Sequence, residues 1–167
     1  MKIKVLYSAK RKFKIGAELI KLFECTNYEH VSILMEDGCI YEAVLPSYRK
    51  ISFFEWSREN IVKKEIVFDV SELEYSKAVE RIKSMIGIKY SVMQLGLIFV
   101  ENIAKIFIRP LGNIISHINL NNNRSLICTE AVLMVLKEIG LKFGESRDTI
   151  SLRDFGLIVS QFKKERK

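Results

Sequence analysis

Two short segments, far apart in the chain, carry side chains that could perform nucleophilic chemistry. Residues 26–43 contain His30 and Glu42, and residues 126–132 contain Cys128. A thiol, an imidazole and a carboxylate are the three chemical parts of a cysteine nucleophile with its base and an orienting group. The chain has only two histidines, so there are few alternatives for the base.

Cys128 is predicted at the start of a helix. Ser125 has the side chain of an N-cap, and Gly140 would end the helix after Ile139. Backbone N–H groups and the positive end of the helix dipole stabilise a thiolate in the first turn, and the same groups can stabilise an oxyanion. The alternative is a packing role, because free cysteine is among the most buried residue types.

His30 and Glu42 are predicted on two paired strands. Two apolar runs, residues 30–35 and 39–44, flank a Glu-Asp-Gly turn sequence, which is typical of a hairpin. Such a turn places Glu42 roughly opposite Ile33, so its contact with His30 depends on the register. An unpaired carboxylate in an apolar strand would be costly, and a histidine partner would remove that cost. A hydrogen-bonded structural histidine is the alternative interpretation of His30.

The order of these motifs resembles the circularly permuted papain-like hydrolases, the YiiX-type relatives of the NlpC-type cell-wall peptidases and of the lecithin–retinol acyltransferases. In that family the histidine precedes the cysteine, the reverse of the order in papain. The resemblance implies Cys128 as the nucleophile, His30 as its general base and Glu42 as the residue that orients the imidazole. The likeness rests on Tyr28-Glu29-His30-Val31-Ser32-Ile33, then Ile40-Tyr41-Glu42-Ala43, and much later Cys128-Thr129-Glu130.

Two further elements are similar to the same family. Residues 87–90 match its Gly-x-x-Tyr element, so we expect Tyr90 to contribute to substrate binding. Residues 148–155 resemble the element that follows the nucleophile, with Ser151 where proline is usual. Glu29 departs from the family pattern, which has a small hydroxyl residue before the histidine. The remaining cysteines and the second histidine lack such a context and are predicted to be structural: Cys25, Cys39 and His117.

The rest of the pattern predicts an α+β fold, a small antiparallel sheet packed by helices. The resemblance implies a circularly permuted papain-like fold, formed as a single domain over residues 1–167. Residues 91–123 would then be an apolar helical insertion and polar loop before the nucleophile helix. Further strands are predicted over 2–7 and 64–70, and further helices over 13–25, over 71–86 with a Ser71/Glu74 capping box, and from Ser151 until it frays into the basic tail.

The segment 95–118 is the most apolar part of the chain. Its charges, Glu101, Lys105 and Arg109, drift slowly round one face of a helix. It could be buried across the core, or it could dock on lipid or form a groove for an acyl chain or a partner helix. No run of 18 uncharged apolar residues exists, and the N-terminus lacks the apolar stretch of a signal peptide. We expect a cytoplasmic protein, with peripheral membrane association through residues 95–118 as the alternative.

The composition limits the classes of partner. At 167 residues, with 49% hydrophobic and 28% charged residues, the chain can bury an ordinary globular core. Its net charge of +7 could favour anionic membranes or acidic cell-wall polymers, or could simply belong to a solvated surface. The aromatic residues do not interleave with the basic ones, so no specific nucleic-acid partner is predicted. The three cysteines lack the spacing of a disulfide framework or zinc site, and no metal or cofactor is predicted.

The sequence therefore predicts a cysteine-dependent hydrolase that cleaves an amide or ester bond through a thioester. A cell-wall peptide or a lipid-linked molecule is the expected substrate. Two alternatives remain open: a lipid acyltransferase with the same cysteine and histidine, and a papain-like binding module without catalysis.

Overall fold

The computed structural model describes residues 1–12, 18, 21–22, 26–92, 96, 125–142 and 150–166. The predicted α+β class is confirmed, because these residues form a five-stranded antiparallel sheet, a short two-stranded parallel sheet and four helices. The large sheet has the order β4-β3-β2-β1-β5. Its strands are β1 (Lys2–Lys10), β2 (His30–Leu34), β3 (Cys39–Ala43), β4 (Tyr48–Ser52) and β5 (Asn60–Asp69), and the small sheet pairs β6 (Lys89–Tyr90) with β7 (Ser125–Leu126). The helices are α2 (Phe53–Glu59), α3 (Glu72–Met85), α6 (Cys128–Glu138) and α7 (Leu152–Glu165).

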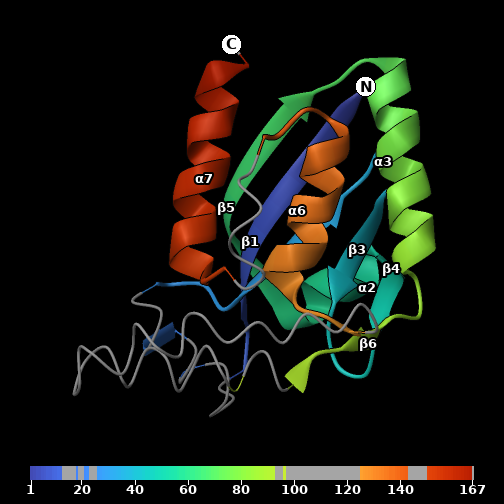
Figure 1. The fold of residues 1–167 in the computed structure, drawn as a ribbon. Helices are drawn as coiled ribbons and strands as arrows, with labels where there is room; N and C mark the ends of the chain where they lie inside the picture. The colour runs from blue at the N-terminus through green and yellow to red at the C-terminus, as the bar shows by residue number, and fades with distance from the viewer. Residues whose placement is uncertain are drawn as a thin grey trace.

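The large sheet separates two apolar clusters. Successive side chains of β1 point to opposite faces, as they must in a strand. Val5 and Tyr7 belong to the larger cluster, on the face where α6 lies between α3 and α7 (Figure 1). Leu6 belongs to the smaller cluster, with Ile40 and with Trp56 of α2. The sheet is therefore the middle layer, with three helices on one face and α2 on the other.

The register of the β2–β3 hairpin places His30 and Glu42 on the same face of the sheet. Ile33 pairs with Tyr41, so the same register puts Glu42 opposite Ser32. Because side chains alternate, His30, Ser32 and Glu42 all point to one side. The expectation that Glu42 lies opposite Ile33 is wrong by one residue. That difference matters because a one-residue shift would move Glu42 to the other face.

Serine side chains cap three of the four described helices. Ser71 accepts a hydrogen bond from the backbone N–H of Glu74, whose carboxylate accepts one in return, which confirms the predicted capping box. Ser151 caps α7 as predicted, and Ser52 caps α2 in the same way. These caps satisfy N–H groups that have no partner within the helix.

Helix α6, which carries Cys128, starts differently from the prediction. Its N-cap is Ile127, which has no side-chain acceptor, and Ser125 lies in β7 instead. Backbone pairing between Ser125 and Lys89 holds the chain extended as far as Leu126. The helix therefore begins at Cys128.

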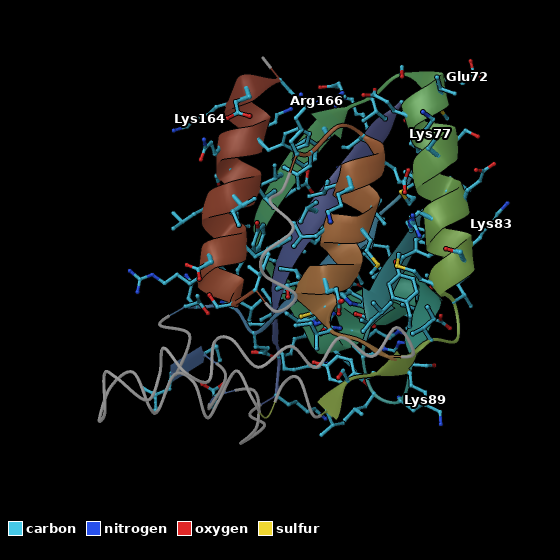
Figure 2. All side chains as sticks on the ribbon, viewed as in Figure 1. Glu72, Lys77, Lys83, Lys89, Lys164 and Arg166 are labelled. Atoms are coloured by element: carbon cyan, nitrogen blue, oxygen red, sulfur yellow. The ribbon has the colours of Figure 1, made fainter. Side chains whose placement is uncertain are left out.

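The predicted fraying at the C-terminal end is also wrong, because α7 continues to Glu165. The Arg166 guanidinium donates to both carboxylate oxygens of Glu74, at 3.0 and 3.2 Å, and to the carbonyl oxygens of Asp69 and Ile139. Figure 2 labels Arg166 at this end of α7, beside β5. One arginine thus links the ends of α3, β5, α6 and α7.

Four elements were not predicted at all: β4, α2, β6 and β7. In β4 the central residues Arg49 and Lys50 are charged and exposed, which hides the strand pattern. Helix α2 has only seven residues, too few for a clear helical period. The strand β5 begins at Asn60, earlier than the predicted residue 64, because it pairs along the whole of β1.

Among the described residues, no helix is long and apolar enough to cross a bilayer. The apolar segment 95–118, apart from Gly96, lies outside the described residues, and so does His117. Most of the helix predicted over residues 13–25, including Cys25, also lies outside them.

Candidate functional site

The hairpin brings the predicted imidazole and carboxylate into direct contact. Nε2 of His30 lies 3.1 Å from Oε2 of Glu42, a hydrogen-bond distance. The Glu42 side chain is only 2% exposed, and that of His30 is 15% exposed. The two residues are diagonal neighbours on adjacent strands, close enough for long side chains to meet.

Glu42 accepts hydrogen bonds from two further side chains that the sequence did not point to. The indole Nε1–H of Trp56 donates to Oε2 at 2.9 Å. Arg49 donates to Oε1 through Nε at 3.0 Å and through Nη2 at 2.7 Å. Arg49 lies directly across from Glu42 on β4, and Trp56 reaches it from α2. Both were missed because their elements were not predicted.

These partners keep the Glu42 carboxylate ionised. Burial alone would raise the pKa of a carboxyl group, because it disfavours the charged form. The hydrogen bonds and opposite charges of His30 and Arg49 outweigh burial and lower the pKa of Glu42 from 4.5 to about 2. Glu42 is therefore an anion throughout the neutral range.

Cys128 is the first residue of α6 and lies against the His30 imidazole. Burial by itself would lower the pKa of His30, but hydrogen bonds and charge interactions with Cys128 and Glu42 raise it well above 6.5. The imidazole thus stands between a sulfur and a carboxylate, and both favour its protonated form.

The first turn of α6 places Cys128 beside backbone N–H groups that have no partner within the helix. The N-cap, Ile127, has no side-chain acceptor for them. Such N–H groups can stabilise an oxyanion that forms on a substrate carbonyl. The helix contacts β2 and β3, the strands that carry His30 and Glu42, and this packing sets the position of the sulfur.

Tyr90 is also brought to this centre. Its strand β6 pairs with β7, which leads directly into α6. Burial and an electrostatic interaction with Cys128 raise the pKa of the Tyr90 hydroxyl. The four site residues predicted from sequence therefore lie together, and Arg49 and Trp56 complete the set.

Hydrogen bonds connect the segments next to these residues. Thr129, which follows Cys128, donates from Oγ1 to the carbonyl oxygen of Ile150 at 2.9 Å, just before α7. Glu29, which precedes His30, is buried and accepts from the backbone N–H of Lys10 at 2.7 Å. Glu29 thus holds the end of β1 in place through this hydrogen bond.

A groove of about 760 Å³ opens beside these segments. Its walls come from α7, from residues 26–28 and from Lys64 of β5. Lys64 is held by a 3.0 Å hydrogen bond to Ser160, and the groove also contains Arg153. Exposed leucines on its rim, Leu22 and Leu157, give it an apolar border.

The other candidate residues have no comparable surroundings. Cys39 is a free thiol, half-buried near the hairpin turn, with its Sγ 3.8 Å from the carbonyl oxygen of Asp37. Within the described part of the chain, no group of three or more histidine, cysteine or acidic side chains could hold a metal ion.

Comparison with known proteins adds no family to this geometry. No protein-family model matches the chain, and a search of curated proteins finds no match for it. The function must therefore be argued from the site itself.

Proposed function

We propose that this chain is a cysteine-dependent hydrolase with a circularly permuted papain-like fold, which cleaves an amide or ester bond through a thioester. The observation that carries the proposal is the arrangement around His30. Its ring lies between Cys128, at the start of a helix, and the buried carboxylate of Glu42, 3.1 Å away. A nucleophile, a base and a group that orients the base form the minimal set for such catalysis.

In the proposed reaction, the Cys128 thiolate attacks the substrate carbonyl carbon. The N–H groups at the start of α6 stabilise the oxyanion that forms. His30, held as an imidazolium by Glu42, gives its proton to the leaving nitrogen or oxygen, and the thioester remains on Cys128. Water then loses a proton to His30 and attacks the thioester, which releases the acid and restores the Cys128 thiolate beside a protonated His30.

The groove beside α7 is the proposed place for part of the substrate. Tyr28 in its wall lies two positions before His30, and Arg153 lies three positions after Ile150, the partner of Thr129. Lys64 and Arg153 favour a substrate with a carboxylate or phosphate group, and the leucines on the rim favour an apolar portion. A peptide or a lipid-linked molecule meets both requirements.

The first test is the selectivity of thiol alkylation. At pH 6, we expect iodoacetamide to modify Cys128 faster than Cys25 or Cys39, because only a thiol kept as thiolate reacts well at that pH. Peptide mapping by mass spectrometry identifies the adduct. The variant His30→Ala should lose this selectivity, whereas His117→Ala should keep it.

The competing candidate, a binding module without catalysis, is favoured by one observation. Cys128 is only 8% exposed, as expected for an inert packing cysteine. Equal and slow alkylation of all three cysteines would support the binding module and exclude the hydrolase. If Cys128 reacts selectively, a screen of short peptides against lipid esters, each with water or a lipid alcohol as acceptor, separates peptidase, esterase and acyltransferase.

A further inference from the structure

Arg49 is the only charged donor to Glu42 besides His30 among the described residues, and it comes from the solvent side. Its side chain is 46% exposed, whereas the carboxylate beneath it is almost fully buried. Both of its hydrogen bonds, 2.7 and 3.0 Å long, end on the same oxygen, Oε1. The other oxygen, Oε2, accepts from His30 and from Trp56. The two carboxylate oxygens thus have separate sets of partners.

This division fixes the orientation of the carboxylate. An ionised carboxylate has about four lone-pair sites, and the four N–H groups around Glu42 occupy that number. Charge-assisted hydrogen bonds are the stronger ones, and Arg49 makes two of them to the same oxygen, so Oε1 is firmly held. With Oε1 held, the group cannot rotate without losing these bonds, and Oε2 stays aimed at Nε2 of His30.

We propose that Arg49 is a positioning residue for the Cys128–His30 pair, which holds Glu42 in the orientation that aligns the imidazole and limits how strongly Glu42 attracts the His30 proton. This inference rests on the proposed function. It assigns to Arg49 two separable effects, one of geometry and one of charge.

The charge effect has a definite sign. Arg49 partly neutralises Glu42, so its removal leaves more negative potential at His30 and Cys128. More negative potential favours the protonated form of both groups, so both pKa values rise. In the described part of the chain, two phenols also interact with this centre, Tyr48 with Glu42 and Tyr90 with Cys128. Burial raises the pKa of both, so they stay neutral.

The geometric effect concerns the alignment of the ring. A lysine at position 49 would keep the positive charge but present a single ammonium group in place of the two N–H groups that converge on Oε1. The carboxylate and the imidazole would then be less well fixed. This predicts a slower reaction at every pH with no change in the pKa values that govern it.

The experiment measures the rate of Cys128 alkylation by iodoacetamide from pH 3 to pH 11 in folded protein. The variants are Arg49→Met, which keeps an apolar stem without charge, and Arg49→Lys, which keeps the charge. Lys50→Met is the matched control, because Lys50 is the next residue of β4 and points to the opposite face, where it pairs with Asp37.

In the profile of alkylation rate against pH, the two limbs are the transitions that reflect the ionisation of Cys128 and of His30. We expect Arg49→Met to move both limbs to higher pH by about one unit. Arg49→Lys should leave the limbs in place and lower the plateau rate about fivefold to tenfold. Lys50→Met should match the wild type. A purely structural role for Arg49 would lower the melting temperature without moving the limbs.

The inference is overturned if folded Arg49→Met has the same pH profile as the wild type. If that variant does not fold, Arg49→Lys decides, and an unchanged plateau rate overturns the geometric role. Failure of the proposed function looks different, since Cys128 of the wild type would then show no selective labelling at all.

Discussion

Glu42 is a buried anion whose charge depends on three neighbours, and this makes its contribution to stability depend on pH. Its pKa is about 2 in the folded protein and 4.5 for the unperturbed side chain. A group with a lowered folded pKa contributes stability that is present above its unfolded pKa and is lost as the pH falls through the folded value. For Glu42 that window lies between pH 4.5 and 2.

We expect Glu42→Gln to remove this pH-dependent stabilisation, which amounts to about 3 kcal/mol. The amide also leaves the charge of Arg49 uncompensated, so the variant should be less stable than the wild type at pH 7. Urea unfolding at pH 5 and pH 3 is the measurement, and the stability of Glu42→Gln should change less between them. Glu72→Gln is the control, since Glu72 lies on the outer side of α3 (Figure 2). An equal loss of stability in wild type and Glu42→Gln would contradict the expectation.

At the scale of residues, sequence patterns located the candidate site but not its support. Cys128, His30 and Glu42 could be named from their residue types and from the resemblance of their motif order to a known family, and Tyr90 from that resemblance alone. Arg49 and Trp56 could not, because an arginine and a tryptophan carry no signal until the strand and helix that position them are known. The register error at Glu42 has the same origin, since turn residues alone do not fix strand pairing to one residue.

At the scale of elements, the contact between α7 and the segment before β2 is unusually tight. A Cβ atom at Gly156 would lie 2.8 Å from the hydroxyl oxygen of Tyr28. Tyr28 also packs edge-on against Tyr7, with ring centroids 4.8 Å apart, so its ring cannot easily move aside. Because Tyr28 lies two residues before His30, the approach of α7 helps to set where β2 begins.

We predict that Gly156→Ala has opposite effects on stability in the wild type and in the variant Tyr28→Phe. In the wild type the new methyl group collides with Tyr28, so the variant should be destabilised although alanine is the better helix former. In a Tyr28→Phe background the oxygen is gone, and the same change should stabilise by up to about 1 kcal/mol. Thermal unfolding of the four proteins gives the coupling energy. Identical effects of Gly156→Ala in both backgrounds would show that the contact is not tight.

Local signals explain which elements the sequence could predict. The caps of α3 and α7 and the hairpin turn are encoded by adjacent residues, and these predictions are confirmed. The start of α6 is set by β6–β7 pairing between residues distant in sequence, which no local pattern contains. For the same reason β4, defined by pairing with β3, was missed.

At the scale of the whole molecule, Arg166 joins α6 and α7 to β5 and α3, which lie more than 40 residues earlier in the sequence. Its partners are Glu74 at the start of α3, Ile139 at the end of α6 and Asp69 at the end of β5. It also lies over the ring of Phe162, 5.7 Å from the centroid. At the end of the molecule opposite the candidate site, one side chain thus holds these elements together.

We expect Arg166→Met to destabilise the protein by about 1–3 kcal/mol, because several charge-assisted hydrogen bonds are lost at once. The labelling rate of Cys128 should not change, since Arg166 touches none of the site residues. Urea unfolding and the alkylation assay measure the two effects. Lys164→Met is the matched control, because Lys164 is exposed on the outer side of α7 (Figure 2). An unchanged unfolding midpoint would show that the C-terminal arginine is not part of the stable structure.

The indole that donates to Glu42 belongs to the only tryptophan in the chain. Tryptophan emission therefore comes from a single ring, buried on α2 and bonded to the carboxylate that orients His30. Any event that changes the charge or position of that carboxylate acts directly on the fluorophore. The protein thus contains its own optical reporter of the candidate site, which can be read without label and before any substrate is known.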